Sequence, residues 1–189
     1  MNAGPLKGGF VNAPVDAAYA FRAMMNAMAR PGTVETLAGA LPPAPLSVAA
    51  GVVVLTLCDP ETPVHLAGTV DCAAVRDWIG FHVGAPVVAR GDAMFVVGRW
   101  DDLMPVHDFA IGTPEYPDRS ATLIVERDAF EPGGAVLRGP GIRDTATLDL
   151  PALDVFRQNA ALFPLGLDFF FTAADQVAAL PRTTKVEAA

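Results

Sequence analysis

The chain has 189 residues, a length that suits one domain, and we expect a single domain over residues 1–189. Its formal net charge of −8, without a run of Lys or Arg, argues against non-specific nucleic-acid binding, which needs cations to neutralise phosphates. The longest apolar stretch is shorter than the ~20 residues that cross a bilayer, so no membrane partner is expected.

Cysteine content and the start of the chain indicate a cytoplasmic protein. Two cysteines, Cys58 and Cys72, are too few for a disulfide framework, so free buried thiols are expected. The N-terminus lacks the pattern of a signal peptide.

Charged residues make up 18% of the chain, against about 25% in typical domains. This low share indicates either a surface covered by a partner or a compact domain rich in Ala.

The first predicted element is a helix over residues 14–29. Pro14 suits its first turn, where an N–H would lack an intrahelical partner, and Pro31 ends it. Four large side chains fall at helical spacing and are expected to form one apolar face: Phe21, Met24, Met25 and Met28.

Residues 46–57 are ambiguous between a strand and a helix. The run of Val favours a strand, but the length and a possible cap at Ser47 favour a buried helix, which we adopt. Further helices are predicted over residues 71–83, capped by Asp71, over 101–108, and over 151–162, beginning at Pro151.

Predicted strands interleave with these helices. They cover residues 64–67, 86–89, 93–98, 120–126, 135–138 and 167–172, with weaker extended segments at 147–150 and 176–180. This order favours an α/β fold, a three-layer-like sandwich with a mixed sheet. The spacings are not those of a regular doubly wound fold.

The usual catalytic signatures are absent from the sequence. There is no P-loop, no dinucleotide-binding fingerprint and no nucleophile elbow. The three histidines lie far apart, so we predict no metal, with a site assembled from distant residues as the alternative. No catalytic residue can be assigned, and no cofactor is expected.

Lysine content argues specifically against pyridoxal phosphate. An aldimine enzyme holds a lysine next to the cofactor ring. The chain has only Lys7 and Lys185, each within a few residues of an end. We therefore predict that this cofactor is not used, whatever the fold.

Three arginines lie beside turn residues and are candidates for anion binding. Glycines allow a backbone to approach an anion closely, and a guanidinium with neighbouring hydroxyls can hold a phosphate or carboxylate. The alternative is that each arginine pairs with an acid or caps a loop, and Asp168 is interpreted as such an acceptor or arginine partner. The candidate residues are Arg119, Arg138, Gly139, Gly141, Arg182, Thr183 and Thr184.

An ordered set of short motifs resembles the PhnH family, the H subunit of the bacterial carbon–phosphorus lyase system. The resemblance runs from about residue 10 to residue 187. The motifs that carry it are Met28-Ala29-Arg30-Pro31-Gly32, Thr62-Pro63-Val64, Gly112-Thr113, Ala121-Thr122-Leu123-Ile124, Leu137–Ile142, Phe163–Asp168 and Pro181-Arg182-Thr183-Thr184.

This resemblance implies a role in organic phosphonate breakdown. In that system the H, G, I and L subunits replace the adenine of ATP by a phosphonate, giving a ribose 1-phosphonate 5-triphosphate. The J subunit, a radical iron–sulfur enzyme, later breaks the carbon–phosphorus bond. Family members resemble pyridoxal-phosphate-dependent transferases in fold but without that cofactor. They form homodimers alone and a larger complex with the G, I and J subunits.

Three functions stay open at this point. The chain could be a non-catalytic or co-catalytic subunit, since no motif for chemistry is complete. It could bind a phosphonate or ATP through Arg138 and Arg182. It could also be a stand-alone transferase whose site forms between two protomers. With two cysteines it lacks the four that usually hold an iron–sulfur cluster, so that chemistry is expected in a partner.

Overall fold

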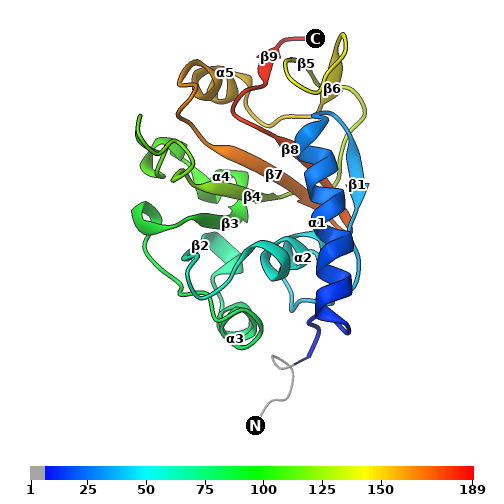
Figure 1. The fold of residues 1–189 in the computed structure, drawn as a ribbon, viewed down its shortest axis with the longest axis vertical. Coiled ribbons are helices and arrows are strands. Elements are labelled where there is room, and N and C mark those ends of the chain that lie inside the picture. The colour runs from blue at the N-terminus through cyan, green and yellow to red at the C-terminus, as the bar shows by residue number, and fades with distance from the viewer. Residues whose placement is uncertain (1–6) are drawn as a thin grey trace.

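A mixed six-stranded sheet organises residues 7–189, which the computed structural model describes (Figure 1). In the order in which they pair, its strands are β1 (Val34–Thr36), β8 (Gln176–Leu180), β7 (Asp168–Ala173), β4 (Thr122–Glu126), β3 (Phe95–Arg99) and β2 (Val64–Leu66). Strands β2, β3, β4 and β7 run parallel, whereas β8 and β1 join antiparallel. The predicted mixed α/β fold is confirmed.

A second sheet of three antiparallel strands lies at one end of the molecule. Its strands, in pairing order, are β6 (Ala146–Leu148), β5 (Ala135–Arg138) and β9 (Lys185–Glu187). Figure 1 shows this sheet at the end that carries the C-terminus. The sequence predicted β5 and the extended segment at β6, but β9 was missed.

Five helices accompany the sheets. They are α1 (Ala13–Ala29), α2 (Val48–Leu57), α3 (Ala73–His82), α4 (Trp100–Leu103) and α5 (Leu153–Ala161). The ambiguous segment at 46–57 is a helix, as we adopted, because the Ser47 hydroxyl caps it by accepting a hydrogen bond from the backbone N–H of Ala50 at 3.1 Å. None of the helices in residues 7–189 is long and apolar enough to cross a membrane.

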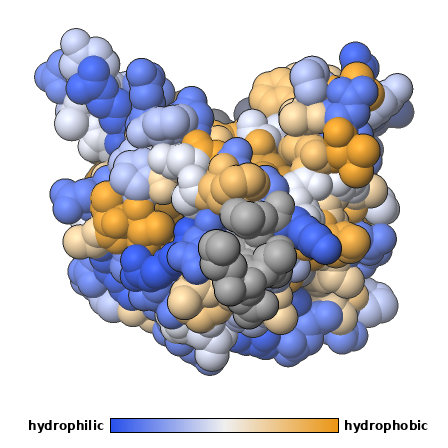
Figure 2. Space-filling view, turned by 90° about the horizontal axis from the view of Figure 1, so that it is seen from below, coloured by the Kyte–Doolittle hydropathy of each residue, from blue (hydrophilic) through white to orange (hydrophobic). Residues whose placement is uncertain are grey.

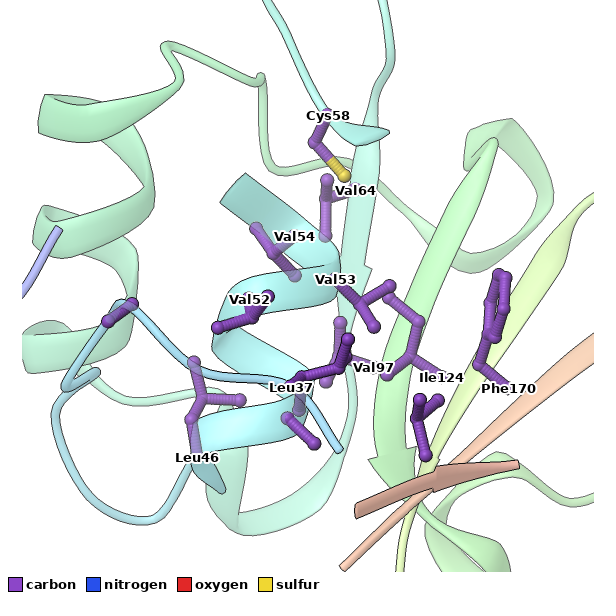
Figure 3. Close-up of a cluster of buried hydrophobic side chains, with 14 of the residues drawn as sticks. Leu37, Leu46, Val52, Val53, Val54, Cys58, Val64, Val97, Ile124 and Phe170 are labelled. Atoms are coloured by element: carbon purple, nitrogen blue, oxygen red, sulfur yellow. The ribbon is translucent and has the colours of Figure 1, made fainter. Parts of the chain in front are cut away.

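Two hydrophobic clusters cover opposite faces of the large sheet. Successive residues of a strand alternate between the faces, so Ile124 packs with α1, α2 and α3, while Leu123 packs with α5 and the small sheet. Figure 3 shows Val53 of α2 beside Val97 and Ile124 of the strands. The result is three layers with the large sheet in the middle.

The apolar face predicted for α1 is only partly confirmed. Met24 is buried at 2% exposure, but Phe21 and Met25 are each 52% exposed. The buried stripe follows Ala20, Met24 and Ala27. Each residue turns about 100° around a helix, so the residues that follow Ala20 and Met24 face outward.

The predicted strand at 86–89 is wrong. Only Val87 forms an isolated bridge, to Val64 at the edge of the large sheet. Pro86 has no N–H to donate, and its carbonyl accepts a bond from the Val64 N–H at 2.8 Å. This short contact covers the outer edge of β2 without adding a full strand.

Three predicted helix details are also wrong. The helix at 101–108 breaks, because Pro105 cannot donate a helical hydrogen bond. Helix α5 begins two residues after Pro151, since Ala152 is extended. Asp71 does not cap α3, because Cys72 occupies the cap position and Asp71 pairs with Arg76.

Candidate functional site

The most polar cluster among the predicted residues is centred on Arg182. Its backbone N–H donates to Asp168 at 2.8 Å, and its Nε lies 3.2 Å from each oxygen of the same carboxylate. Its Nη1 donates to the carbonyl of Pro117 at 2.7 Å, and its Nη2 donates to the Ser120 hydroxyl and to Asp168. All three guanidinium nitrogens are therefore bound by the protein.

The sequence left open whether Arg182 binds an anion or pairs with an acid, and the structure shows it paired with an acid. Asp168 is the arginine partner and loop acceptor that we expected, and the Arg182 side chain is only 12% exposed. The ion pair joins the start of β7 to the segment after β8 and to the loop at 117–120. A ligand could recruit this guanidinium only by displacing bonds that hold the fold together.

The second group of candidates adjoins the first in space. An added Cβ on Gly139 would lie 3.2 Å from the carbonyl oxygen of Thr183, so the turn after β5 lies against the segment before β9. Arg138 is about half exposed, with a long 3.4 Å contact to Glu187 and a 3.3 Å bond to the carbonyl of Asp144. Arg138 is thus the least committed arginine of the two groups.

The remaining candidates are dispersed. Arg119 is exposed and stacks over the ring of Tyr116 at 4.2 Å. Thr183 lines a shallow hollow with Arg182, whereas Thr184 is buried and its hydroxyl has no hydrogen-bond partner among the described residues. Gly141 lies against the last turn of α1. The structure therefore does not gather the seven candidates into one cradle.

A different site lies where the parallel strands β3 and β4 end. A cavity of about 330 Å³ is lined there by Arg99, Trp100, Asp101, Glu126, Arg127, Asp128, Ala129 and Glu131. Ligands of α/β proteins commonly bind outside the carboxyl ends of parallel strands. Sequence reasoning missed this site, although the predicted strand 120–126 ends in Glu126 and the predicted strand 93–98 is followed directly by Arg99, which was a usable signal.

Glu126 is the most unusual group in this cavity. It is only 7% exposed, and burial raises the pKa of its carboxyl, partly opposed by hydrogen bonds from Ser47 and Thr172. The Ser47 N–H at the start of α2 donates to it at 2.7 Å, and the Thr172 hydroxyl lies at 3.1 Å. A buried acid with a raised pKa in a cavity can take up or release a proton.

The arginines around Glu126 are engaged elsewhere. Arg99 pairs with Asp128 at 2.7 Å, and Arg127 pairs with Asp149. The Arg99–Asp128 pair is exposed and contributes little to stability. The cavity therefore combines a buried carboxyl with an exposed ion pair at its rim, and its lining includes no histidine or cysteine.

Two further predictions concern the absence of a metal and the absence of pyridoxal phosphate. Residues 7–189 contain no group of three or more His, Cys, Asp or Glu placed to hold a metal ion. Lys7 and Lys185 are exposed, and neither lines this cavity. The absence of pyridoxal phosphate stays a prediction.

A cavity near α5 is mostly apolar, with His107, Gln158 and Asn159 as the polar residues of its lining. It measures about 520 Å³ and lies between α5 and the loop at 104–111. Asn159 on its wall is occupied, because its amide donates to the Leu167 carbonyl at 2.9 Å and accepts from the Leu167 N–H at 2.7 Å. This cavity suits an apolar side chain better than a phosphorylated substrate.

Fold and site together define a mixed α/β protein that carries a polar cavity at the ends of two parallel strands. The family model for the bacterial phosphonate metabolism protein PhnH matches residues 8–187. The chain therefore belongs to the PhnH family.

Two curated relatives extend this finding. The α-D-ribose 1-methylphosphonate 5-triphosphate synthase subunit PhnH of Rhizobium meliloti (strain 1021) is 43% identical over 189 residues, covering 95% of this chain and 94% of the relative. A protein of Stutzerimonas stutzeri whose name gives it as a candidate C-P lyase subunit, HtxG, is 29% identical, covering 94% of each. The resemblance seen in the sequence is confirmed at the level of the family.

Proposed function

We propose that this chain is the H-type subunit of the complex that makes ribose 1-phosphonate 5-triphosphate from ATP and an organic phosphonate. The observation that carries the proposal is the 43% identity, over 95% of the chain, to a relative named as a subunit of such a synthase. Likeness along almost the whole chain supports a shared role more strongly than a single motif would.

In the proposed reaction a phosphonate oxygen forms a bond to C1′ of the ribose of ATP. The bond between C1′ and the adenine breaks, adenine leaves with a proton, and the triphosphate stays on the ribose. The G, I and L subunits act together with this chain, and the J subunit acts on the product. The chain forms a larger assembly with the G, I and J subunits, binds no nucleic acid and works in the cytoplasm.

Within this complex the chain is a non-catalytic or co-catalytic subunit. This role is supported by Arg182, the candidate cation with the most polar neighbours. Its guanidinium nitrogens are already bound by Asp168, Ser120 and the carbonyl of Pro117. The same proposal holds that residues 1–189 act as one domain, that the chain forms a homodimer when isolated, and that its fold is akin to the pyridoxal-phosphate-dependent transferases.

The test is reconstitution from purified subunits. The G, I and L subunits are mixed with ATP and methylphosphonate, with and without this chain, and adenine is measured by chromatography. We expect adenine release only when this chain is present, and none from the chain alone. Equal adenine release without the chain, or turnover by the chain alone, would contradict the proposal.

A second candidate function is direct ligand binding, and the cavity at Glu126 favours it. Its lining combines a buried carboxyl with the exposed Arg99–Asp128 pair, which a phosphorylated ligand could open. Arg119, Arg138 and Thr183 also keep exposed atoms for an anion such as a phosphonate or ATP.

Calorimetry with ATP and with methylphosphonate tests this second function. Binding lost in Arg99→Ala supports a site in the cavity, and binding lost only in Arg138→Ala supports a site on the second sheet. A stand-alone transferase with a site between protomers is the remaining alternative.

A further inference from the structure

Arg99 and Glu126 are the last residues of two neighbouring parallel strands, β3 and β4. The two residues are paired in register, and Glu126 is paired in the same way with Thr172 of β7. Residues opposite each other on neighbouring strands point to the same face of a sheet. Their side chains therefore form a row at the ends of the strands, and the first two line the cavity of about 330 Å³.

The charges of this cavity disfavour an anion inside it. Its lining has four acidic and two basic residues, and both arginines already have acidic partners. A triphosphate or a phosphonate placed there would face an excess of negative charge. The acids do not form a metal site either, because residues 7–189 contain no three such groups placed to hold a metal ion. The cavity therefore suits an uncharged group that donates hydrogen bonds to carboxylates.

Trp100 adds a flat aromatic surface to the cavity. It follows β3 directly, begins α4 and lines the cavity while staying partly exposed. Its ring packs on Phe156 of α5, with 5.2 Å between the ring centroids, and this contact holds the indole in place. Nucleobases stack on aromatic side chains of this kind. The cavity volume lies at the lower end of the range of about 300–1,000 Å³ for ligand sites, which suits one base better than a whole nucleotide.

Glu126 can tell one purine from another. Its two oxygens accept hydrogen bonds from the Ser47 N–H at 2.7 Å and the Thr172 hydroxyl at 3.1 Å, and each oxygen can make one further bond. A neutral carboxyl offers one donor and one acceptor, which match the ring nitrogen and the amino group of adenine. An ionised carboxylate offers only acceptors, which match the two neighbouring donors of guanine. The raised pKa of Glu126 favours the neutral form, and hence adenine.

We propose that the cavity at the ends of β3 and β4 binds the adenine base of ATP, stacked on Trp100 and hydrogen-bonded to the carboxyl of Glu126. The assignment rests on the proposed function, which makes ATP a substrate, and it names the end of ATP that this chain holds. The phosphates then extend past the exposed Arg99–Asp128 pair, where Arg99 is the cation that a phosphate can take from Asp128. This role is recognition of the base, which agrees with a non-catalytic subunit.

Phe81 of α3 supplies an internal control. It is another exposed aromatic ring, 59% exposed, and it is not part of the cavity lining. Figure 2 shows the end of the molecule that carries α3, where apolar and hydrophilic areas alternate. A base that stacks without specificity on any exposed ring would bind there as well. Binding that depends on Trp100 but not on Phe81 therefore identifies the cavity.

The first test is calorimetry of the purified full chain with adenosine, ATP, GTP and inorganic tripolyphosphate. We expect adenosine and ATP to bind, and GTP to bind about tenfold or more weakly than ATP, because its base leaves polar groups unpaired. Tripolyphosphate, which has no base, should not bind. Adenosine should also quench the fluorescence of Trp100, since the other tryptophan, Trp78, is fully buried.

Variants then test the two residues that hold the base. Trp100→Leu should weaken adenosine binding about tenfold or more, while Trp100→Phe keeps a stacking surface and most of the affinity but loses the quenching. Glu126→Ala should weaken binding to a similar degree, whereas Glu126→Gln should retain it, because an amide also offers one donor and one acceptor. Phe81→Leu should leave the Kd unchanged. Circular dichroism confirms that each variant is folded, and the selectivity and quenching of the native chain decide where one is not.

Four results would overturn the assignment: no adenosine binding by the folded native chain, equal affinity for ATP and GTP, tripolyphosphate binding as tight as that of ATP, or a Kd unchanged in folded Trp100→Leu. Adenosine binding by a chain that the G, I and L subunits do not need for adenine release would support this site and contradict the proposed function. Adenine release that requires a chain unable to bind adenosine would do the reverse.

Discussion

Glu126 accepts a hydrogen bond from the backbone N–H of Ser47 at 2.7 Å, although 79 positions separate them in the sequence. The bond joins the end of β4 to the start of α2, in which Ser47 is the N-cap. A carboxyl group at a helix N-terminus meets unpaired N–H groups and the positive end of the helix dipole. Burial nevertheless prevails and raises the pKa of Glu126.

The variant Glu126→Gln should be more stable than the native chain at neutral pH. The unfolded chain loses the Glu126 proton near the ordinary glutamate pKa of 4.5, whereas the raised pKa lets the folded chain keep it to a higher pH. Native stability therefore falls as pH rises between these two pKa values, and glutamine removes that loss while retaining the acceptor for Ser47. A gain of about 1 kcal/mol would raise the melting temperature by roughly 2–4 °C.

The measurement is thermal melting of both proteins from about pH 4.5 to pH 8. The advantage of the variant should be small at the acidic end and grow with pH until it levels off. Glu131→Gln, an exposed change in the same cavity, should alter the melting temperature little at any pH. A Glu126→Gln curve parallel to the native one would show that folding does not raise the pKa of Glu126.

Arg182→Ala should destabilise the fold much more than Arg138→Ala. Removing Arg182 leaves Asp168 without its partner in a site that is mostly buried, which we expect to cost about 3 kcal/mol. Arg138 is about half exposed, so its removal should change the free energy of unfolding by less than about 0.5 kcal/mol. Urea unfolding of the two variants measures both. Loss of ATP or phosphonate binding by Arg182→Ala at unchanged stability would instead make it a ligand residue.

Gly141→Ala should be among the most damaging small substitutions. Gly141 has φ near 80°, and an added Cβ would lie 1.8 Å from the carbonyl oxygen of Ala29. Gly133 has a similar φ of 87° with no atom within 4 Å, so Gly133→Ala isolates the backbone strain, about 1 kcal/mol. The difference between the two variants in urea unfolding reports the clash. Equal effects would mean that the turn moves away from α1 freely.

The two cysteines should differ sharply in reactivity. Burial raises the pKa of Cys58 to about 12, so almost no thiolate forms near neutral pH. Cys72 is partly exposed at the start of α3. Iodoacetamide under native conditions should label Cys72 first, as peptide mass spectrometry can measure, while both should react in urea. Labelling of Cys58 at the rate of Cys72 would show that the core opens readily.

Sequence patterns predicted those helices and strands whose local signals agree with the contacts that they make in the fold. Helix α1 and strands β4, β5 and β7 fall close to the predicted bounds, because proline positions mark the helix and short runs of apolar residues mark the strands. Strands β1 and β9 are three residues long and take their form from partners across the sheet, which no local pattern records. Phe21 and Met25 are apolar but exposed, so composition alone could not tell core from surface.

The candidate site was predicted less well than the fold. Arginines beside turns were a reasonable signal for anion binding, but whether Arg182 is free depends on Asp168 and Ser120, which only the fold brings to it. Glu126 escaped notice because it ends a hydrophobic strand and its partner Ser47 lies far away in the sequence. Long-range pairing decides the role of each of these residues.

Co-expression with the G, I and J subunits of the same genome tests whether this chain is a subunit of the phosphonate-processing complex. One tagged partner is purified and the stoichiometry is measured by native mass spectrometry. We expect the chain to be recovered in a fixed ratio to its partners through size-exclusion chromatography. A folded chain that elutes apart from an otherwise complete assembly would contradict it.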